Sequence, residues 1–321
     1  FITAIILASA GTYFSNTADI DFVEKEIVNH LQTTAESRAS HIKTYFDQNI
    51  ERLVLITTKT QLRIELETYN ENKNQESLDK ITKIIEDAKI PIEDFERICV
   101  VGLDGKIITS TNPSFIGRDV SDEHFFNRAK ENNSIHFIEE NGEMMLFVSG
   151  PFISKGKLIG VGITVVSIDK LDKIVRDRTG LDETGEVLVA IQGDEKRIYL
   201  FDRLFESKAV VQDIESELTA EPMKQALLGN NLFFEDSLDY RNKPVLAVSK
   251  FVSLDSSDGE GLGIVVKMDR EETFGFVEER FWKTSLLLII SIVILTSIVG
   301  FFIARLISTP IKKLNENVNA V

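Results

Sequence analysis

The residue types that most often carry out chemistry are scarce in this chain and are poorly spaced for it. Cys99 is the only cysteine, so the chain can form no intramolecular disulfide and no thiolate metal cluster. It lies in the apolar run Ile98–Val101 and is expected to be a small core residue. The sequence contains neither a P-loop nor a nucleophile elbow. The paired acids are adjacent in sequence, at Glu139-Glu140, Glu271-Glu272 and Glu278-Glu279. Such pairs are typical of solvated faces and helix starts.

The histidines and the remaining acidic residues do not predict a metal site. His30 and His41 share a helix face but lie about three turns apart, too far to hold one ion. His124 and His136 could come close together in the fold, although isolated histidines are more often surface or capping residues. The acids around Gly185 lack the ligand spacing of a calcium loop. We therefore predict no catalytic residue, no metal and no cofactor in this segment.

Composition and charge narrow the possible partners. The chain has 321 residues, enough for two or three domains, and a formal net charge of −15 at pH 7. This acidity disfavours nucleic acid and anionic membrane surfaces, because both would repel the chain. The sequence starts at Phe1 rather than at Met, so we expect it to be a fragment of something longer.

The elements that could position a functional site are organised around one apolar segment. Thr284–Ala304 carries no charge and is bounded by Lys283 and Arg305. As a helix it would be about 30 Å long, which matches the hydrocarbon core of a bilayer. Aromatic residues precede it and basic residues follow it, which favours a cytoplasmic C-terminus, although Lys283 weakens that asymmetry. The alternative is a buried helix of a large soluble core.

The first residues are also apolar. As a helix, Phe1–Phe14 would span about 21 Å, which is too little for a bilayer. We expect this segment to be the end of a truncated first transmembrane helix. The small residues Ala8-Ser9-Ala10 also fit the cleavage site of a signal peptide, so a signal-peptide remnant is the alternative. Either interpretation places the middle of the chain outside the cytoplasm.

A second pattern follows the long apolar segment. Ser308-Thr309-Pro310 is expected to end the helix. Ile311, Leu314, Val318 and Val321 then follow at spacings of three, four and three, as in the a and d positions of a coiled coil. Because they come directly after a predicted span, the last residues resemble the first helix of a HAMP signalling module. An ordinary amphipathic juxtamembrane helix is the alternative.

The stretch between residues 15 and 90 contains neither glycine nor proline. Apolar residues recur there on average about every 3.6 positions from Ile20 to Ile56, which predicts one long amphipathic helix. We expect it to pack along its length against a partner subunit or against the domains that follow. The polar run Asn70–Gln75 breaks the pattern, and a second, shorter helix is predicted to end before Pro91.

The apolar period then changes to that of strands. The predicted strands are Phe95–Val101, Lys106–Ser110, Ser134–Glu139, Glu143–Ile153 and Lys157–Ile168. Asp104-Gly105 and Asn141-Gly142 are strong hairpin signals. Ser121 is expected to cap a short helix that carries Phe125 and Phe126. The prediction is a five-stranded antiparallel sheet with helices on one face.

The same order of elements recurs in the second half of the chain. Its predicted elements are the strands Glu186–Ile191, Lys196–Phe201, Leu232–Leu238, Pro244–Val252 and Leu262–Met268 and the helix Pro222–Leu228. The first two strands are predicted to pair across Gly193-Asp194. GKLIGVGITVVSIDKL and GEGLGIVVKMDREE occupy the same place in each half, which indicates an internal duplication. The predicted fold class is α+β, with a long N-terminal helix carrying two tandem antiparallel-sheet modules, plus a transmembrane helix.

From about Thr17 to Arg280 the chain resembles the double Cache (dCache) sensor domains of bacterial and archaeal receptors. The phrases that carry the resemblance are VSGPFISKGKLIGVGITVVSIDKL in the first half and GLDETGEVLVA, LDYRNKPVLAVSKFV and GLGIVVKMDREETF in the second. The resemblance implies two PAS-like extracytoplasmic modules, a homodimer, and a small-molecule ligand bound in the membrane-distal module. It gives the expected parts as a truncated transmembrane helix (1–14), a stalk helix and second helix (15–90), a membrane-distal Cache module (91–178), a membrane-proximal Cache module (179–270), a linker helix (271–283), a transmembrane helix (284–304) and the start of HAMP (305–321).

Amino-acid-binding members of that family carry an Arg, a Trp two residues on, a Tyr after it, an Ala three further along, and an Asp in the fifth strand. The aromatic pair and the Ala match Phe125, Phe126 and Ala129. Glu123 stands where the Arg would clamp a ligand carboxylate, and Thr164 or Val165 lies near the position of the Asp. These departures argue against an α-amino-acid ligand.

On this basis we predict a ligand pocket in the membrane-distal module. The expected ligand-binding residues are Glu123, Phe125, Phe126, Arg128, Phe147, Ser149 and Thr164. Phe125 and Phe126 would wall the pocket, although core packing explains both equally well. A cation paired with Glu123 and an acid paired with Arg128 remain open as ligand classes.

The resemblance implies a transmembrane signalling receptor in the cell membrane. We expect a missing cytoplasmic output module that is a histidine kinase, or alternatively that of a methyl-accepting chemotaxis receptor or a nucleotide cyclase. A ligand-induced shift would pass through residues 271–283 and the span to the seam that begins at Ile311. A membrane-anchored structural or adhesive ectodomain is the second class of function left open.

Overall fold

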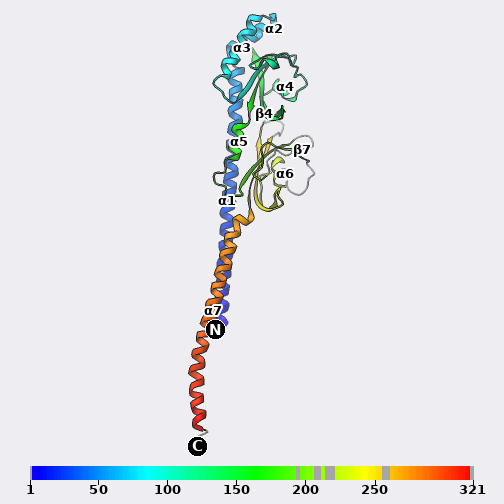
Figure 1. Cartoon of the computed structure of the whole chain (residues 1–321). Helices are drawn as coiled ribbons and strands as arrows, with labels where there is room; N and C mark the ends of the chain where they lie inside the picture. The colour runs from blue at the N-terminus through cyan, green and yellow to red at the C-terminus, as the bar shows by residue number, and fades with distance from the viewer. Residues whose placement is uncertain (1, 193–195, 206–210, 214–220, 255–260, 319–321) are drawn as a thin grey trace. The chain divides into compact units, whose positions relative to one another are not determined.

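The computed structural model describes residues 2–192, 196–205, 211–213, 221–254 and 261–318. The chain divides into two compact units, Leu31–Asp269 and a unit formed by Phe1–His30 with Arg270–Val321. The first of these units contains two antiparallel sheets and the helices that pack on them (Figure 1). The predicted α+β class, with a long N-terminal helix and two tandem sheet modules, is confirmed.

Three helices precede the first sheet. They are α1 (Ile2–Thr57), α2 (Thr60–Asn72) and α3 (Gln75–Lys89). The predicted break at the polar run is confirmed, because Lys73 adopts a left-handed backbone with φ 51° after α2. The Asn74 side chain then accepts a hydrogen bond from the backbone N–H of Glu76 at 3.0 Å and caps α3.

A second break, between α1 and α2, is not predicted by the sequence. Lys59 has an extended backbone (φ −61°, ψ 115°), although neither glycine nor proline marks the place. The Thr58 hydroxyl donates to the carbonyl of Val54 at 2.6 Å. This bond satisfies one of the carbonyls that the end of a helix leaves without a partner.

The first module, β1 to β5 with α4 (His124–Ala129), is built on a five-stranded antiparallel sheet in the order β2-β1-β5-β4-β3. Its strands are β1 (Phe95–Val101), β2 (Ile107–Ser110), β3 (Ser134–Glu140), β4 (Glu143–Ser154) and β5 (Lys157–Ser167). Asn141 and Gly142 turn the hairpin between β3 and β4 with φ 55° and 85°, the left-handed region that favours these two residue types. The predicted strands and this turn are therefore confirmed.

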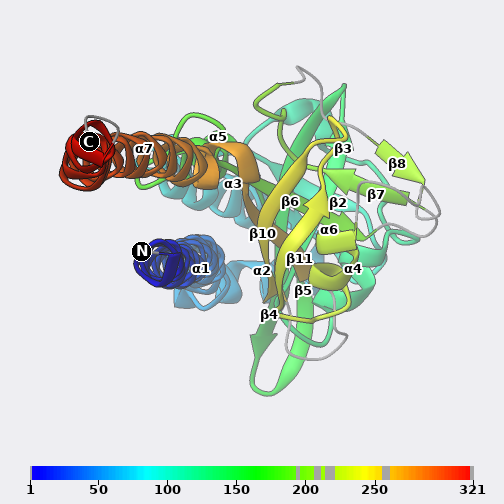
Figure 2. The same ribbon diagram turned by 90° about the horizontal axis from the view of Figure 1, so that it is seen from below.

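Helices cover both faces of this sheet, so the prediction that they lie on one face is wrong (Figure 2). On one face α4 packs against β3, β4 and β5. On the other face α1 and α2 approach β4 and β5 at glycines. A Cβ added to Gly162 would lie 2.8 Å from Cγ2 of Thr57, and one added to Gly160 would lie 3.2 Å from Cδ2 of Leu66. The glycines of β5 therefore allow the helices to approach the sheet closely.

Polar contacts connect α1 to both modules and to the segment between them. The Tyr45 hydroxyl donates to a β5 carbonyl at 3.1 Å in the first module. Arg38 donates to the Asp177 carboxylate at 2.8 Å and to its carbonyl at 2.7 Å. In the second module, the Lys250 ammonium on β10 lies 3.0 Å from the carboxylate of Glu36 on α1. Helix α1 is therefore a common support for both sheets.

The second module, β6 to β11 with α6 (Glu221–Leu227), repeats this plan with a sheet in the order β8-β7-β6-β11-β10-β9. Its strands are β6 (Glu186–Gln192), β7 (Lys196–Tyr199), β8 (Val211–Asp213), β9 (Phe233–Leu238), β10 (Pro244–Ser253) and β11 (Gly261–Asp269). The β8 strand is not predicted by the sequence, and the predicted turn at Gly193-Asp194 lies outside the described residues. Helix α5 (Asp169–Arg176) connects the two modules in sequence.

The last element is the long helix α7 (Arg270–Val318). The helix continues past Pro310, so the prediction that Ser308-Thr309-Pro310 ends it is wrong. Within the described residues, one helical stretch is long and apolar enough to cross a membrane, Trp282–Leu306, with a mean hydropathy of 3.0. The side chains of the predicted seam beginning at Ile311 lie outside the described part of the chain.

Candidate functional site

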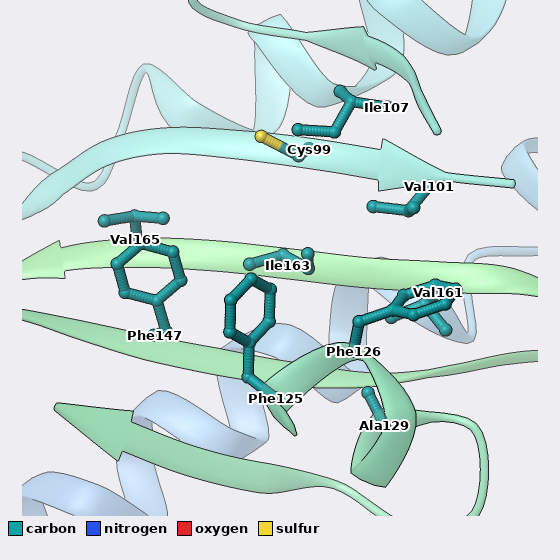
Figure 3. Close-up of a cluster of buried hydrophobic side chains, with 10 residues drawn as sticks. All are labelled: Cys99, Val101, Ile107, Phe125, Phe126, Ala129, Phe147, Val161, Ile163 and Val165. Atoms are coloured by element: carbon teal, nitrogen blue, oxygen red, sulfur yellow. The ribbon is translucent and has the colours of Figure 1, made fainter. Parts of the chain in front are cut away.

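Helix α4 places two phenylalanines against the first sheet. Phe125 is 6 % exposed, Phe126 is 1 % exposed, and both point from α4 towards β5 (Figure 3). Glu123, not Ser121, is the N-cap residue, and no side chain caps the helix. Instead, the Asn127 amide donates to the carbonyls of Ser121 and Glu123 at 3.0 and 3.2 Å, which fixes the turn that leads into α4.

The sheet below α4 provides an apolar floor. Cys99 on β1 pairs with Ile163 on β5, and Val165 on β5 pairs with Phe147 on β4. Because directly opposed residues of antiparallel strands share a face, all four side chains point to the α4 side (Figure 3). The rings of Phe125 and Phe147 lie 5.2 Å apart, so the helix and the sheet are in direct contact.

A cavity of about 130 Å³ with an open mouth lies between this floor and the segment that precedes α4. Its apolar lining includes Cys99, Phe125, Ile138, Phe147 and Ile163. Four charged residues also line it: Arg97, Arg118, Glu123 and Glu140. A concave apolar surface with a few convergent polar groups is typical of small-molecule sites.

Arg97 is the most buried of these charges, with 8 % of its side chain exposed. Its guanidinium donates two bonds to the Glu140 carboxylate, Nη1 to Oε2 at 2.6 Å and Nη2 to Oε1 at 3.0 Å. The guanidinium carbon lies 3.8 Å from the ring centroid of Phe115 and 5.4 Å from that of Phe147. The two rings and the carboxylate therefore hold the cation in one orientation.

Arg118 brings a second guanidinium to the same carboxylate. Its Nη1 atom lies 3.7 Å from Oε1 of Glu140, and its guanidinium carbon lies 4.6 Å from the centroid of Phe115. With 60 % of its side chain exposed, Arg118 lies at the mouth of the cavity. Two cations therefore share one anion at this place.

The structure brings together only some of the predicted site residues. Glu123, Phe125 and Phe147 line the cavity, whereas Phe126 belongs to the core beside it. The Ser149 hydroxyl is buried behind α4, where it donates to the carbonyl of Phe125 at 3.0 Å. The cavity lining does not include Arg128.

Thr164 is placed elsewhere. It pairs with Val148, and its hydroxyl donates to the Val148 carbonyl at 3.3 Å. Because side chains alternate along a strand, Thr164 lies on the opposite face of β5 from Ile163 and Val165, where α1 and α2 pack. The prediction that it projects into the pocket with Phe147 is therefore corrected.

Three charged lining residues, Arg97, Arg118 and Glu140, are missed by the sequence analysis. A signal exists for the first of them. Alternation along β1 places Arg97 on the same face as Cys99 and Val101, and a charged residue on an otherwise apolar inward face is unusual. No such pattern identifies Arg118, which comes from a loop, or Glu140, which is the last residue of β3.

The first module also contains a buried cysteine and a pair of neighbouring histidines. Burial raises the pKa of the Cys99 thiol, which lies 3.3 Å from the Ser110 hydroxyl. The imidazoles of His124 and His136 do come together, with ring centroids 5.2 Å apart. Among the described residues, no group of three or more His, Cys, Asp or Glu side chains could hold a metal ion.

The second module has only a small hollow of about 20 Å³ below α6, and its charges are paired. The ammonium of Lys267 on β11 lies 2.7 Å from the Asp239 carboxylate and 3.1 Å from that of Glu186. The Tyr240 hydroxyl donates to Glu186 at 2.9 Å, and Arg241 binds Asp239. Burial alone would raise the pKa of Asp239, but the hydrogen bonds from Lys267 and Arg241 hold it below its usual value.

The sequence identifies the class of protein to which this fold and this site belong. The family model described as a Cache domain, of the double (dCache) type, matches residues 21–277. The chain therefore belongs to the Cache domain family, as the resemblance implied. A search of curated proteins by sequence finds no match.

Solved structures with the same fold include sensory domains of bacterial receptors. The sensory domain of the Campylobacter jejuni chemoreceptor Tlp3 with isoleucine bound has a TM-score of 0.54 at 12% identity, covering 81% of this chain and 98% of that one. The ligand-binding domain of the Pseudomonas fluorescens chemoreceptor CtaA with L-leucine has a TM-score of 0.51 at 14% identity, covering 79% and 99%. The sensor domain of the V. cholerae histidine kinase DctB has a TM-score of 0.52 at 15% identity, covering 77% and 98%. At these identities the likeness describes the fold.

Proposed function

We propose that the chain is the sensory part of a transmembrane receptor and that the cavity below α4 in the first module binds a small-molecule ligand. The observation that supports this is the cavity itself, in which four charged side chains converge above an apolar floor. In the second module, by contrast, the hollow below α6 measures only about 20 Å³, which is too small for such a ligand. The first module is therefore the better candidate for ligand binding.

The proposal places the first module distal to the membrane and the second module proximal to it. The apolar stretch Trp282–Leu306 is 25 residues long and carries few charges, and residues 284–304 within it would span the bilayer. Residues 15–283 would then be extracytoplasmic and the C-terminus cytoplasmic, in line with the basic residues after the span. Residues 1–14 would be the end of a first transmembrane helix.

The signal would travel from the first module to the cytoplasm along the helices. A homodimer would pair through the long helices, and residues 305–321 would be the start of a HAMP module. Among output modules we favour a histidine kinase, with a chemotaxis receptor and a cyclase as alternatives. Polar residues at Leu314 and Val318 would then uncouple signalling while leaving ligand binding unchanged.

A thermal screen of the full chain in lipid nanodiscs tests the binding function. The panel consists of amino acids, polyamines, carboxylates, nucleobases and sugars. A ligand at 100 times its dissociation constant stabilises the folded state by about 2.7 kcal/mol, which raises the midpoint of unfolding by several degrees. Empty nanodiscs are the control. If no compound class shifts the midpoint, direct small-molecule sensing by this chain is contradicted.

A further inference from the structure

We propose that the ligand of the first-module cavity is a small carboxylic acid whose carboxylate takes the place of the Glu140 side chain on the Arg97 guanidinium. The inference depends on the proposed function, because it assigns a chemical class to the ligand of the same cavity. The Glu140 carboxylate accepts hydrogen bonds from both Nη atoms of Arg97. Glu140 therefore stands where an external carboxylate would bind.

Arg97 is already arranged for a carboxylate. A guanidinium presents two parallel N–H groups that match the two oxygens of one carboxylate. In this chain the guanidinium is also held by the rings of Phe115 and Phe147, at 3.8 and 5.4 Å. A ligand carboxylate would meet a cation whose orientation is already fixed, so little conformational freedom would be lost on binding.

The Glu140 carboxylate that leaves Arg97 has a second partner nearby. Arg118 lies 3.7 Å from Oε1 of Glu140 and has 60 % of its side chain exposed. When Glu140 gives up Arg97, its side chain can remain beside Arg118 at the mouth of the cavity. Both guanidiniums would then have a carboxylate partner, the ligand on Arg97 and Glu140 on Arg118. The exchange therefore leaves no buried charge without a partner.

A cationic ligand does not fit the same charged groups. A ligand ammonium that took the Glu140 carboxylate would leave the buried Arg97 guanidinium without its anion, which is strongly unfavourable. A ligand ammonium on Glu123 would form its ion pair at an exposed side chain, where such pairs contribute little to binding. The charges of the cavity therefore favour an acid over an amine.

The apolar lining of the cavity indicates what the rest of the ligand looks like. Below the charged groups, the lining consists of Cys99, Phe125, Ile138, Ile163 and Val165. This surface accommodates a short aliphatic or aromatic tail. Because one carboxylate replaces another on Arg97, burial of the tail supplies most of the favourable free energy of binding. The ligand class is therefore a monocarboxylate with a short apolar tail.

The test is a titration of the full chain in nanodiscs with matched probes. The acids are propionate, butyrate, isovalerate and phenylacetate, and the comparison compounds are isoamylamine and isoamyl alcohol. We expect at least one acid to bind and neither comparison compound to do so. If isoamylamine binds and no acid does, the inference is overturned and the proposed receptor function stands. If no acid binds but a compound of another class from the thermal panel does, the inference is likewise overturned and the proposed receptor function stands.

Three variants test whether the ligand carboxylate binds by displacing Glu140 from Arg97. Glu140→Gln removes the competing carboxylate, so we expect it to bind the acid about tenfold more tightly than the wild type. Arg118→Gln changes an exposed side chain and should fold normally, but it should bind about tenfold more weakly because the displaced Glu140 loses its partner. Glu96→Gln, at an exposed residue next to Arg97 on β1, is the control and should bind as the wild type does. Equal or weaker binding by Glu140→Gln would overturn the exchange.

Discussion

At the scale of single residues, the first-module cavity combines an apolar floor with charges held by aromatic rings. The ring centroid of Phe115 lies 3.8 Å from the guanidinium carbon of Arg97 and 4.6 Å from that of Arg118. The two phenylalanines of α4 have different positions, since Phe125 lines the cavity and Phe126 is packed in the core beside it. Neighbouring residues of one short helix therefore serve binding and stability separately.

Substitution of these two phenylalanines should separate the two effects. Phe126→Ala is expected to lower the free energy of unfolding by about 3–5 kcal/mol because it leaves a cavity in the core. Ligand affinity, measured in the folded protein, should stay close to that of the wild type. Phe125→Ala should weaken ligand binding, because its ring is part of the lining. Loss of affinity in Phe126→Ala alone would contradict this assignment.

The single cysteine provides an independent readout of the cavity. Because burial raises the pKa of Cys99 and leaves 2 % of the residue exposed, its thiol should react with methyl methanethiosulfonate at least about tenfold more slowly at pH 8 than in the urea-unfolded chain. The rate should rise with pH above the usual range of a thiol, since the thiolate is the reacting form. Bound ligand should slow the reaction further. Equal rates in the folded and unfolded chain would contradict the burial.

At this scale the sequence predicts the aromatic part of the site better than its charged part. Phe125 is recognised because it matches an aromatic position of the amino-acid-binding pattern, and Phe147 on β4 lies with it in the cavity lining, as expected. Arg97, Arg118 and Glu140 come from a strand, a loop and the end of another strand, so only the folded chain brings them together. Thr164 is misplaced because a shift of one residue along a strand moves a side chain to the other face.

At the scale of elements, α1 depends on a few polar contacts for its attachment to the modules. Arg38 donates to the carboxylate and carbonyl of Asp177 and to the carbonyl of Thr179. Hydrogen bonds from Thr179 and from Arg38 lower the pKa of Asp177 to about 2. This contact connects the helix to the segment that follows α5.

The lowered pKa makes this contact sensitive to acid. The folded-state pKa of Asp177 lies below its unfolded value, so its contribution to stability is present above about pH 4 and is lost as the pH falls towards 2. Asp177→Asn should therefore lower the thermal midpoint at pH 7, and its difference from the wild type should shrink below pH 4. Asp47→Asn, which removes an exposed pair with Lys43 on α1, is the control and should have little effect. A difference that stays constant down to pH 3 would contradict the account.

The turn between β9 and β10 is attached to the end of β11 in a similar way. Asp239 binds Lys267 and Arg241, and Arg241 also binds Asp269, the residue directly before α7. The Asp239 side chain is 1 % exposed. The network therefore joins three segments of the second module at the point where the chain leaves it.

Removal of the central carboxylate should be costly. Asp239→Asn removes the carboxylate that Lys267 and Arg241 share and leaves each cation only its other partner, Glu186 or Asp269, so we expect it to lower the free energy of unfolding by about 1–3 kcal/mol. Denaturant unfolding followed by circular dichroism measures the change. Lys243→Gln is the control, because its ammonium is exposed and lies 3.9 Å from Asp269, so it should change stability by less than about 0.5 kcal/mol. Similar values for the two variants would show that the network is not a structural unit.

The differences between predicted and observed elements have physical reasons. Strand ends are predicted closely because Asn-Gly turns and strand alternation are local signals. The break at Lys59 is not predicted, because apolar spacing continues through it and no glycine or proline marks it. Pro310 does not end α7, since a helix can pass a proline when the missing N–H bond is compensated nearby.

At the scale of the whole molecule, two modules of one plan differ in what lies between helix and sheet. In the second module Lys267 is paired with two carboxylates below α6. In the first module a cavity with an open mouth remains below α4. The sequence predicts the duplication because each half repeats the same order of strands. It does not predict which half is open, since that depends on side chains that meet only after folding.

The most direct measurement of the central claim is titration calorimetry of one ligand from the screen against three proteins in nanodiscs. Val165→Phe fills the first-module cavity, and Val265→Phe makes the same change on the equivalent strand of the second module. We predict that the ligand binds the wild type and Val265→Phe with similar affinity and that binding to Val165→Phe is lost. Binding that survives in Val165→Phe and is lost in Val265→Phe would contradict the account and place the ligand in the second module.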